Sequence, residues 1–84
     1  MFQVLFYTKE NCLLCHEAEQ MLSLFEGRYS FQLVKRDIYS DEQLLEKYHL
    51  EIPVMEVKGK QIANEEIDLE SIETLLKFGE KELS

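Results

Sequence analysis

The sequence predicts an α/β domain in the order β-α-β-α-β-β-α, with a four-stranded mixed sheet and helices on both of its faces. Two observations carry this prediction. Dense apolar runs of strand length alternate with segments whose apolar residues recur every three or four positions, which is the spacing of one helix face. The chain has 84 residues and contains no linker, repeat or low-complexity segment, so residues 1–84 are expected to form one domain.

The first part of the chain predicts a strand, a helix and a second strand. Phe2 to Tyr7 is an unbroken apolar and aromatic run, typical of a strand buried on both faces. A helix is expected to begin at Cys12 and to end at Gly27. Its apolar stripe consists of Leu14, Ala18, Met21, Leu22 and Phe25. The second strand begins at Phe31 and stops near Asp37, and the helix between the strands predicts a right-handed crossover with parallel pairing.

The middle of the chain predicts a short helix with a defined start. Ser40-Asp41-Glu42-Gln43 has the pattern of a capping box, in which the Ser40 side chain caps the helix and Gln43 reaches back. The apolar residues of this helix are Leu44, Leu45 and Tyr48.

The last part of the chain predicts a β-hairpin and a final helix. Val54 to Val57 has strand character, and Gly59-Lys60 is expected to form the tight turn to a short antiparallel partner, Gln61 to Ala63. Asp68 is placed to cap the final helix. The apolar stripe of that helix consists of Leu69, Ile72, Leu75 and Leu76.

The charge of the chain excludes several classes of partner. Its formal net charge is −8, and an acidic surface repels phosphate backbones and anionic headgroups, so we expect neither nucleic acid nor a membrane as a partner. The acidic residues gather from Glu65 onward, where they either attract a basic partner protein or form a solvated helix face. No basic signal-peptide start and no bilayer-length apolar stretch are visible. A soluble cytoplasmic protein is therefore expected, and the lack of an obvious dimer patch favours a monomer.

Cys12 and Cys15, the two cysteines of the chain, stand where the first strand gives way to the first helix. The unpaired N–H groups and the positive dipole end of a helix's first turn stabilise a thiolate, which is the reactive form of the sulfur. Residues three apart share a helix face, so the two sulfurs can meet. We therefore predict that Cys12 attacks a substrate disulfide and that Cys15 resolves the mixed disulfide, with no bound cofactor. Lys9 is close enough in sequence to add a positive charge.

The residues leave other roles open for the pair. A structural disulfide closing so short a loop would contribute only about 2 kcal/mol, and the cytosol would reduce it. A metal or Fe–S module needs four ligands, which two chains could supply together, since neither His16 nor His49 completes a set. With His16 the motif also matches the haem-attachment pattern C-x-x-C-H, a role that goes with export and a helical fold. A non-catalytic protein-binding domain would keep the fold with dispensable cysteines.

Taken together, these segments resemble a glutaredoxin-like protein of the thioredoxin superfamily, over essentially the whole chain. The resemblance rests on Leu5-Phe6-Tyr7-Thr8-Lys9 leading into Cys12-Leu13-Leu14-Cys15, on Ile52-Pro53-Val54 and on the hairpin around Gly59. It implies a thioredoxin-like fold and a disulfide reductase or electron carrier, with Cys12 as the nucleophile and Cys15 as the resolving thiol. It further implies that Pro53 is a cis-proline facing the cysteines. The backbone of Ile52 would pair with an extended substrate or glutathione, and Lys9 would help to hold the glutathione carboxylate.

Two departures from the family pattern concern the substrate. Leu13 and Leu14 replace the usual proline and aromatic residue between the cysteines, and this apolar lip favours a protein surface over glutathione. The family's glutathione-binding Gly-Gly-x-Asp segment is expected near Ala63-Asn64-Glu65-Glu66, which has neither glycine and carries acids that repel a carboxylate. The chain has no tryptophan and so differs from ordinary thioredoxins. We expect protein or small-molecule disulfides as substrates. The electron source is expected to be either glutathione or a thioredoxin reductase-like flavoenzyme, and the two departures disfavour the binding of glutathione.

Overall fold

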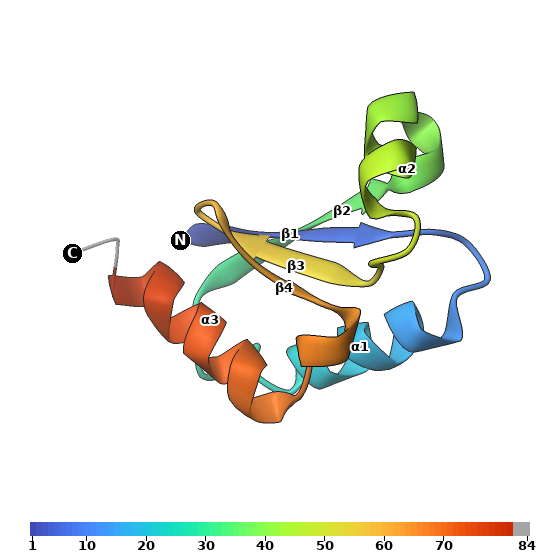
Figure 1. Ribbon diagram of the computed structural model, residues 1–84. Helices are drawn as coiled ribbons and strands as arrows, with labels where there is room; N and C mark the ends of the chain where they lie inside the picture. Colours follow the sequence, from blue (N-terminus) through green and yellow to red (C-terminus); the bar gives the residue numbers. More distant parts are fainter. Residues whose placement is uncertain (82–84) are drawn as a thin grey trace.

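The computed structural model describes residues 1–81 and contains the predicted elements in the predicted order (Figure 1). The elements are β1 (Phe2–Thr8), α1 (Leu13–Ser23), β2 (Phe31–Asp37), the 3₁₀ turn η1 (Ile38–Ser40), α2 (Glu42–Tyr48), β3 (Val54–Val57), β4 (Lys60–Ala63), the 3₁₀ turn η2 (Asn64–Glu66) and α3 (Leu69–Lys81). Within the described residues, no helix is long and apolar enough to cross a bilayer.

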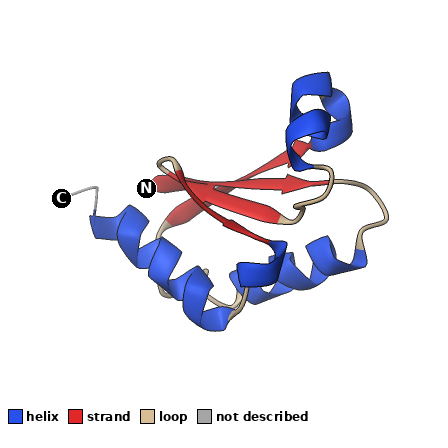
Figure 2. Ribbon diagram, viewed as in Figure 1, coloured by secondary structure: helices blue, strands red, loops and turns tan. Residues whose placement is uncertain are grey.

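The four strands form one mixed sheet in the order β2-β1-β3-β4. β1 runs parallel to β2, whereas β3 is antiparallel to both β1 and β4. α1 and α3 cover one face of the sheet, and α2 lies on the other face at one end (Figure 2). The predicted mixed sheet with helices on both faces is therefore confirmed, and the fold is thioredoxin-like.

The side chains of β1 show how unequally the two faces are covered. Phe2, Val4 and Phe6 point toward α1 and α3 and are at most 3% exposed. On the other face, Tyr7 stacks on Tyr48 of α2 with ring centroids 4.4 Å apart, but Gln3 is exposed. The prediction of a strand buried on both faces is therefore wrong for the first half of β1, because α2 covers only one end of its face.

Helix α1 ends at Ser23, four residues before Gly27, which was expected to end it. After Ser23 the hydrogen bonds tighten to the three-residue spacing of a 3₁₀ turn, with the N–H of Phe25 donating to the carbonyl of Leu22 at 3.0 Å. This tighter winding places Phe25 in the core, where it is 5% exposed. Gly27 does not adopt the left-handed conformation that makes glycine a helix terminator.

Two further boundaries differ from the prediction by one residue. Asp41 rather than Ser40 caps α2, and its Oδ1 accepts the N–H of Gln43 at 2.8 Å. The hairpin turn is Lys58-Gly59 rather than Gly59-Lys60, with φ values of 49° and 88°. Two successive left-handed residues give the turn whose twist matches the flanking strands, and Lys60 therefore already belongs to β4.

The predicted cap of α3 is confirmed. Oδ1 of Asp68 accepts the N–H of Ser71 at 2.7 Å, and this hydrogen bond lowers the pKa of Asp68 below its ordinary value. Of the predicted apolar stripe, Ile72, Leu75 and Leu76 are buried. Leu69, in the first turn, is 48% exposed.

Candidate active site

Cys12 occupies the N-cap of α1, immediately after the loop that leaves β1. Asn11 has φ 56°, a left-handed conformation that asparagine tolerates, and this residue turns the chain into the helix. Sγ of Cys12 accepts a hydrogen bond from the N–H of Cys15 at 3.1 Å. The backbone carbonyl of Cys12 accepts a hydrogen bond from the N–H of His16 at 3.0 Å. The sulfur therefore takes the place that a serine or aspartate oxygen takes at most helix starts, at the positive end of the helix dipole.

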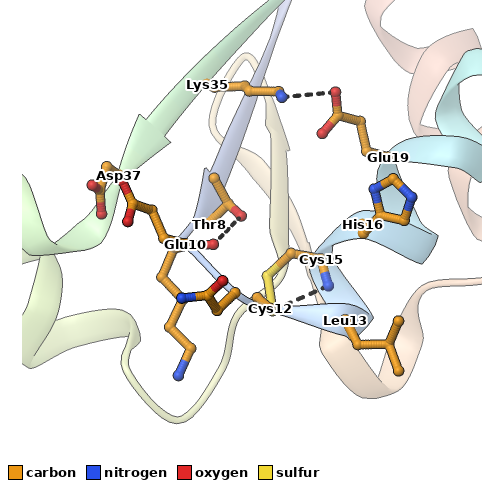
Figure 3. Close-up of a pocket in the computed structure, with 11 residues that line it drawn as sticks. Thr8, Glu10, Cys12, Leu13, Cys15, His16, Glu19, Lys35 and Asp37 are labelled. Atoms are coloured by element: carbon orange, nitrogen blue, oxygen red, sulfur yellow. Dashed lines mark hydrogen bonds and ion pairs between the residues drawn. A yellow bond between two sulfur atoms is a disulfide. The ribbon is translucent and has the colours of Figure 1, made fainter.

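Cys12 and Cys15 form a disulfide, with their Cα atoms 5.2 Å apart (Figure 3). The two sulfurs meet as the spacing of three predicts. Their burial differs, since Cys12 is half-buried whereas Cys15 is only 3% exposed and belongs to the hydrophobic core. An approaching molecule therefore reaches Cys12 first.

A cavity of about 720 Å³ lies beside the pair, between α1 and the ends of β1 and β2 (Figure 3). Lys9 lines this cavity together with both cysteines, as its place in the sequence predicts. Lys35 of β2 reaches across to α1, where its Nζ lies 2.9 Å from Oε2 of Glu19. Glu19 was not singled out from the sequence. Its position four residues after Cys15, on the same helix face, is the sequence signal that would have placed it near the cysteine pair.

The Ile52–Pro53 peptide bond is cis, so the cis-proline implied by the resemblance is confirmed. Val54 pairs with Tyr7 in the sheet, so Pro53 stands at the end of β1 from which the cysteine loop departs. The N–H of Ile52 donates to the carbonyl of Tyr48 at 3.1 Å, so this N–H is already engaged within the protein. Neither Ile52 nor Pro53 lines the cavity that holds Lys9 and the cysteines.

Tyr7, the sheet partner of Val54, has an altered acidity. Burial against α2 raises the pKa of its hydroxyl above the ordinary value of 10.0, and the carboxylate of Glu56 adds to the effect. This phenol therefore stays neutral at physiological pH and supplies no charge to the site.

Of the segment expected in place of Gly-Gly-x-Asp, Ala63 ends β4 and the next three residues form η2. The N–H of Asn64 donates to the carbonyl of Glu51 at 3.2 Å, which ties this segment to the residue before Ile52. Leu50, Glu51 and Glu65 line a second cavity of about 330 Å³ here, and Leu50 is 84% exposed. Sequence reasoning missed Leu50 and Glu51, because only the tertiary structure brings them beside η2.

Residues 1–81 contain no group of three or more His, Cys, Asp or Glu side chains that could hold a metal ion. His16 is exposed, and the ring of His49 lies 3.1 Å from the carbonyl of Leu45 at the end of α2. A four-thiolate site would therefore require cysteines from two chains, as the sequence indicated.

A disulfide at the first turn of α1 and a cis-proline at the start of a neighbouring strand place the protein among thioredoxin-fold proteins with a redox-type site. The glutaredoxin-like domain family (DUF836) matches residues 3–77, and the chain belongs to this family. A solved structure titled "Structure of a malarial protein" has a TM-score of 0.65 to this chain at 16% identity, covering 94% of this chain and 97% of that one. At this identity the likeness shows a shared fold. The glutaredoxin-like resemblance found in the sequence is therefore confirmed.

Proposed function

We propose that the protein is a thiol–disulfide oxidoreductase that reduces disulfides by dithiol exchange through Cys12 and Cys15. The observation that supports this role is the unequal setting of the two sulfurs. Cys12 is accessible at the helix start and accepts a backbone N–H, whereas Cys15 is buried one turn further along. A nucleophile needs the first setting, and a resolving thiol that must not react with solvent thiols needs the second.

The exchange proceeds in two displacements. The Cys12 thiolate attacks one sulfur of the substrate disulfide, forming a mixed disulfide, and the other substrate sulfur leaves as a thiolate that takes a proton from water. Cys15 then loses its proton and attacks Sγ of Cys12. The mixed disulfide breaks, the second substrate thiol is released, and the Cys12–Cys15 disulfide forms. Two electrons have passed from the protein to the substrate.

The dithiol is restored by two molecules of glutathione, which become glutathione disulfide, or by the dithiol of a thioredoxin reductase-like flavoenzyme. In this proposal Lys9 attracts the glutathione carboxylate from the cavity beside Cys12, while the cis-Pro53 loop offers the Ile52 carbonyl to an extended substrate. Glu51 and Glu65, on the η2 side of this loop, oppose a carboxylate. We propose a cytoplasmic location, where such a donor is present.

Single-cysteine variants test this function. Cys12→Ser is expected to abolish disulfide reduction while keeping the fold, because serine is a good N-cap residue. Cys15→Ser is expected to accumulate a mixed disulfide on Cys12, detectable as an added mass that dithiothreitol removes. A Cys12→Ser protein with full reductase activity would refute the proposal.

A further inference from the structure

Apolar side chains stand exposed at the start of α1, beside the cysteines, and in the loop that leads to cis-Pro53. Leu13 and Leu14, on the first turn of α1, are 72% and 53% exposed. In Figure 3 the Leu13 side chain projects outward next to Cys12. Leu50, two residues before Ile52 in the loop that leads to cis-Pro53, is 84% exposed. Side chains as exposed as these contribute little to the packing of the domain and leave apolar surface for a partner to cover.

Carboxylates surround these leucines, and we call Glu10, Glu17, Glu51 and Glu65 the acidic rim. Glu10 lines the same cavity as Cys12. Glu17 stands one helical turn after Leu13 on the same face of α1. Glu51 and Glu65 line the cavity next to Leu50. The whole chain carries a net charge of −8, so the field around the site is negative at long range as well.

We infer that the preferred substrates are polypeptide disulfides with an apolar side chain beside the cysteine and basic residues around it. This inference rests on the proposed function and names the substrate class of the same site. The exposed leucines offer a surface that an apolar segment of the substrate can cover. The acidic rim attracts cationic side chains and repels anionic ones. A small neutral disulfide has no charge for the acidic rim to act on and little apolar surface to place over the leucines. An anionic disulfide such as that of glutathione meets repulsion from the four carboxylates of the acidic rim, which Lys9 in the cavity beside Cys12 offsets only in part.

A single-turnover experiment tests the charge preference and needs no external electron donor. The reduced protein is mixed with a disulfide-closed peptide, which is reduced to its dithiol while Cys12 and Cys15 are oxidised. Two peptides share one apolar sequence around the cysteines and carry either lysine or glutamate flanks, and hydroxyethyl disulfide is the small neutral probe. We expect a second-order rate constant about tenfold higher for the lysine peptide at low ionic strength, falling toward equality near 0.5 M salt.

Leucine variants test the apolar contact. Leu13→Ser combined with Leu14→Ser is expected to lower the rate constant for the lysine peptide about tenfold, because the two leucines become buried under the bound peptide and serine side chains do not contribute this apolar burial. The rate constant with hydroxyethyl disulfide should fall by a clearly smaller factor than the rate constant with the lysine peptide. Leu24→Ser is the matched control, since Leu24 is 67% exposed beyond the other end of α1. Equal losses on both probes, or an equal loss in the control, would overturn the inference.

Charge variants separate the acidic rim from the net charge. Glu51→Lys with Glu65→Lys is expected to remove most of the preference for the lysine peptide. Glu26→Lys with Glu46→Lys changes the net charge by the same amount, at exposed positions outside the acidic rim. This control variant is expected to keep most of the preference for the lysine peptide. Equal rates of the original protein with both peptides would overturn this inference alone. No reaction with any probe, hydroxyethyl disulfide included, would overturn the proposed function and this inference with it.

Discussion

Among the three glycines of the chain, Gly79 in α3 leaves the least room for an added methyl group. A Cβ at Gly79 would lie 2.6 Å from Cδ2 and Cε2 of Phe2 and 2.8 Å from Cγ1 of Val57. Both neighbours are core residues, at 3% and 0% exposure. The Phe2 ring is further confined by Phe31, whose ring centroid lies 6.2 Å away. The added methyl group therefore displaces packed side chains rather than filling space.

Two opposing effects set the magnitude of Gly79→Ala. Alanine is favoured over glycine in a helix interior by about 1 kcal/mol. Overpacking a filled core costs about 1–3 kcal/mol, and two separate side chains must move here, so the upper part of that range applies. We expect a net destabilisation of about 1–2 kcal/mol, which for a domain of this size lowers Tm by about 5–10 °C.

Urea unfolding of the oxidised proteins, followed by circular dichroism, measures this difference. Gly27→Ala is the matched control, because nothing lies within 4 Å of its added Cβ and Gly27 has no left-handed φ. The control is expected to be neutral or more stable by about 0.4–1 kcal/mol. A Gly79→Ala protein at least as stable as the original would refute the packing argument.

Two further predictions concern pH and the electron donor. The Ser71 N–H lowers the pKa of Asp68 in the folded protein. The ionised carboxylate therefore stabilises the fold fully at pH values above its ordinary pKa of 3.8, and this stabilisation is lost as the pH falls through the lowered pKa. The urea midpoint of Asp68→Ala should therefore lie below that of the original protein at pH 7, with the gap narrowing below about pH 4. For the donor, NADPH-coupled turnover with thioredoxin reductase should exceed turnover with glutathione and its reductase. Lys9→Ala should raise the KM for glutathione several-fold without changing turnover with the flavoenzyme. The control Lys77→Ala, on α3, should change neither the KM for glutathione nor the turnover with the flavoenzyme. If both variants raise the KM for glutathione equally, the role of Lys9 is contradicted.

The element order and the cysteine site were predictable because their signals are local. The spacing of the apolar residues changes from that of a strand to that of a helix around Cys12. Cys15 follows three residues later and therefore lies on the same helix face as Cys12. The cis-proline was different, since only about 5–6% of X–Pro bonds are cis in folded proteins. Its prediction came from the resemblance to a family and not from the residues around Pro53.

The errors arose where two local solutions compete and the tertiary path decides. Ser40 and Asp41 are both good N-cap residues. The side chain of Asp37 accepts the N–H of Tyr39 and starts η1, in which Ser40 Oγ donates to the carbonyl of Asp37 at 2.6 Å. With Ser40 engaged in that turn, Asp41 becomes the cap of α2. The exposure of Leu50 likewise depends on where the loop into β3 runs, which no local pattern encodes.

Strand β1 connects the tightly packed contact with α3 to the site proposed to carry the chemistry. Phe2, at one end, packs against Gly79, whereas Thr8, at the other end, lines the cavity that holds Cys12. Six residue steps along a strand place these ends about 20 Å apart. Gly79→Ala should therefore leave the single-turnover rate constant with hydroxyethyl disulfide unchanged at temperatures well below its Tm. A parallel fall in stability and rate would mean that the packing of α3 holds the helix start in place, and the two ends of β1 would then act as one unit.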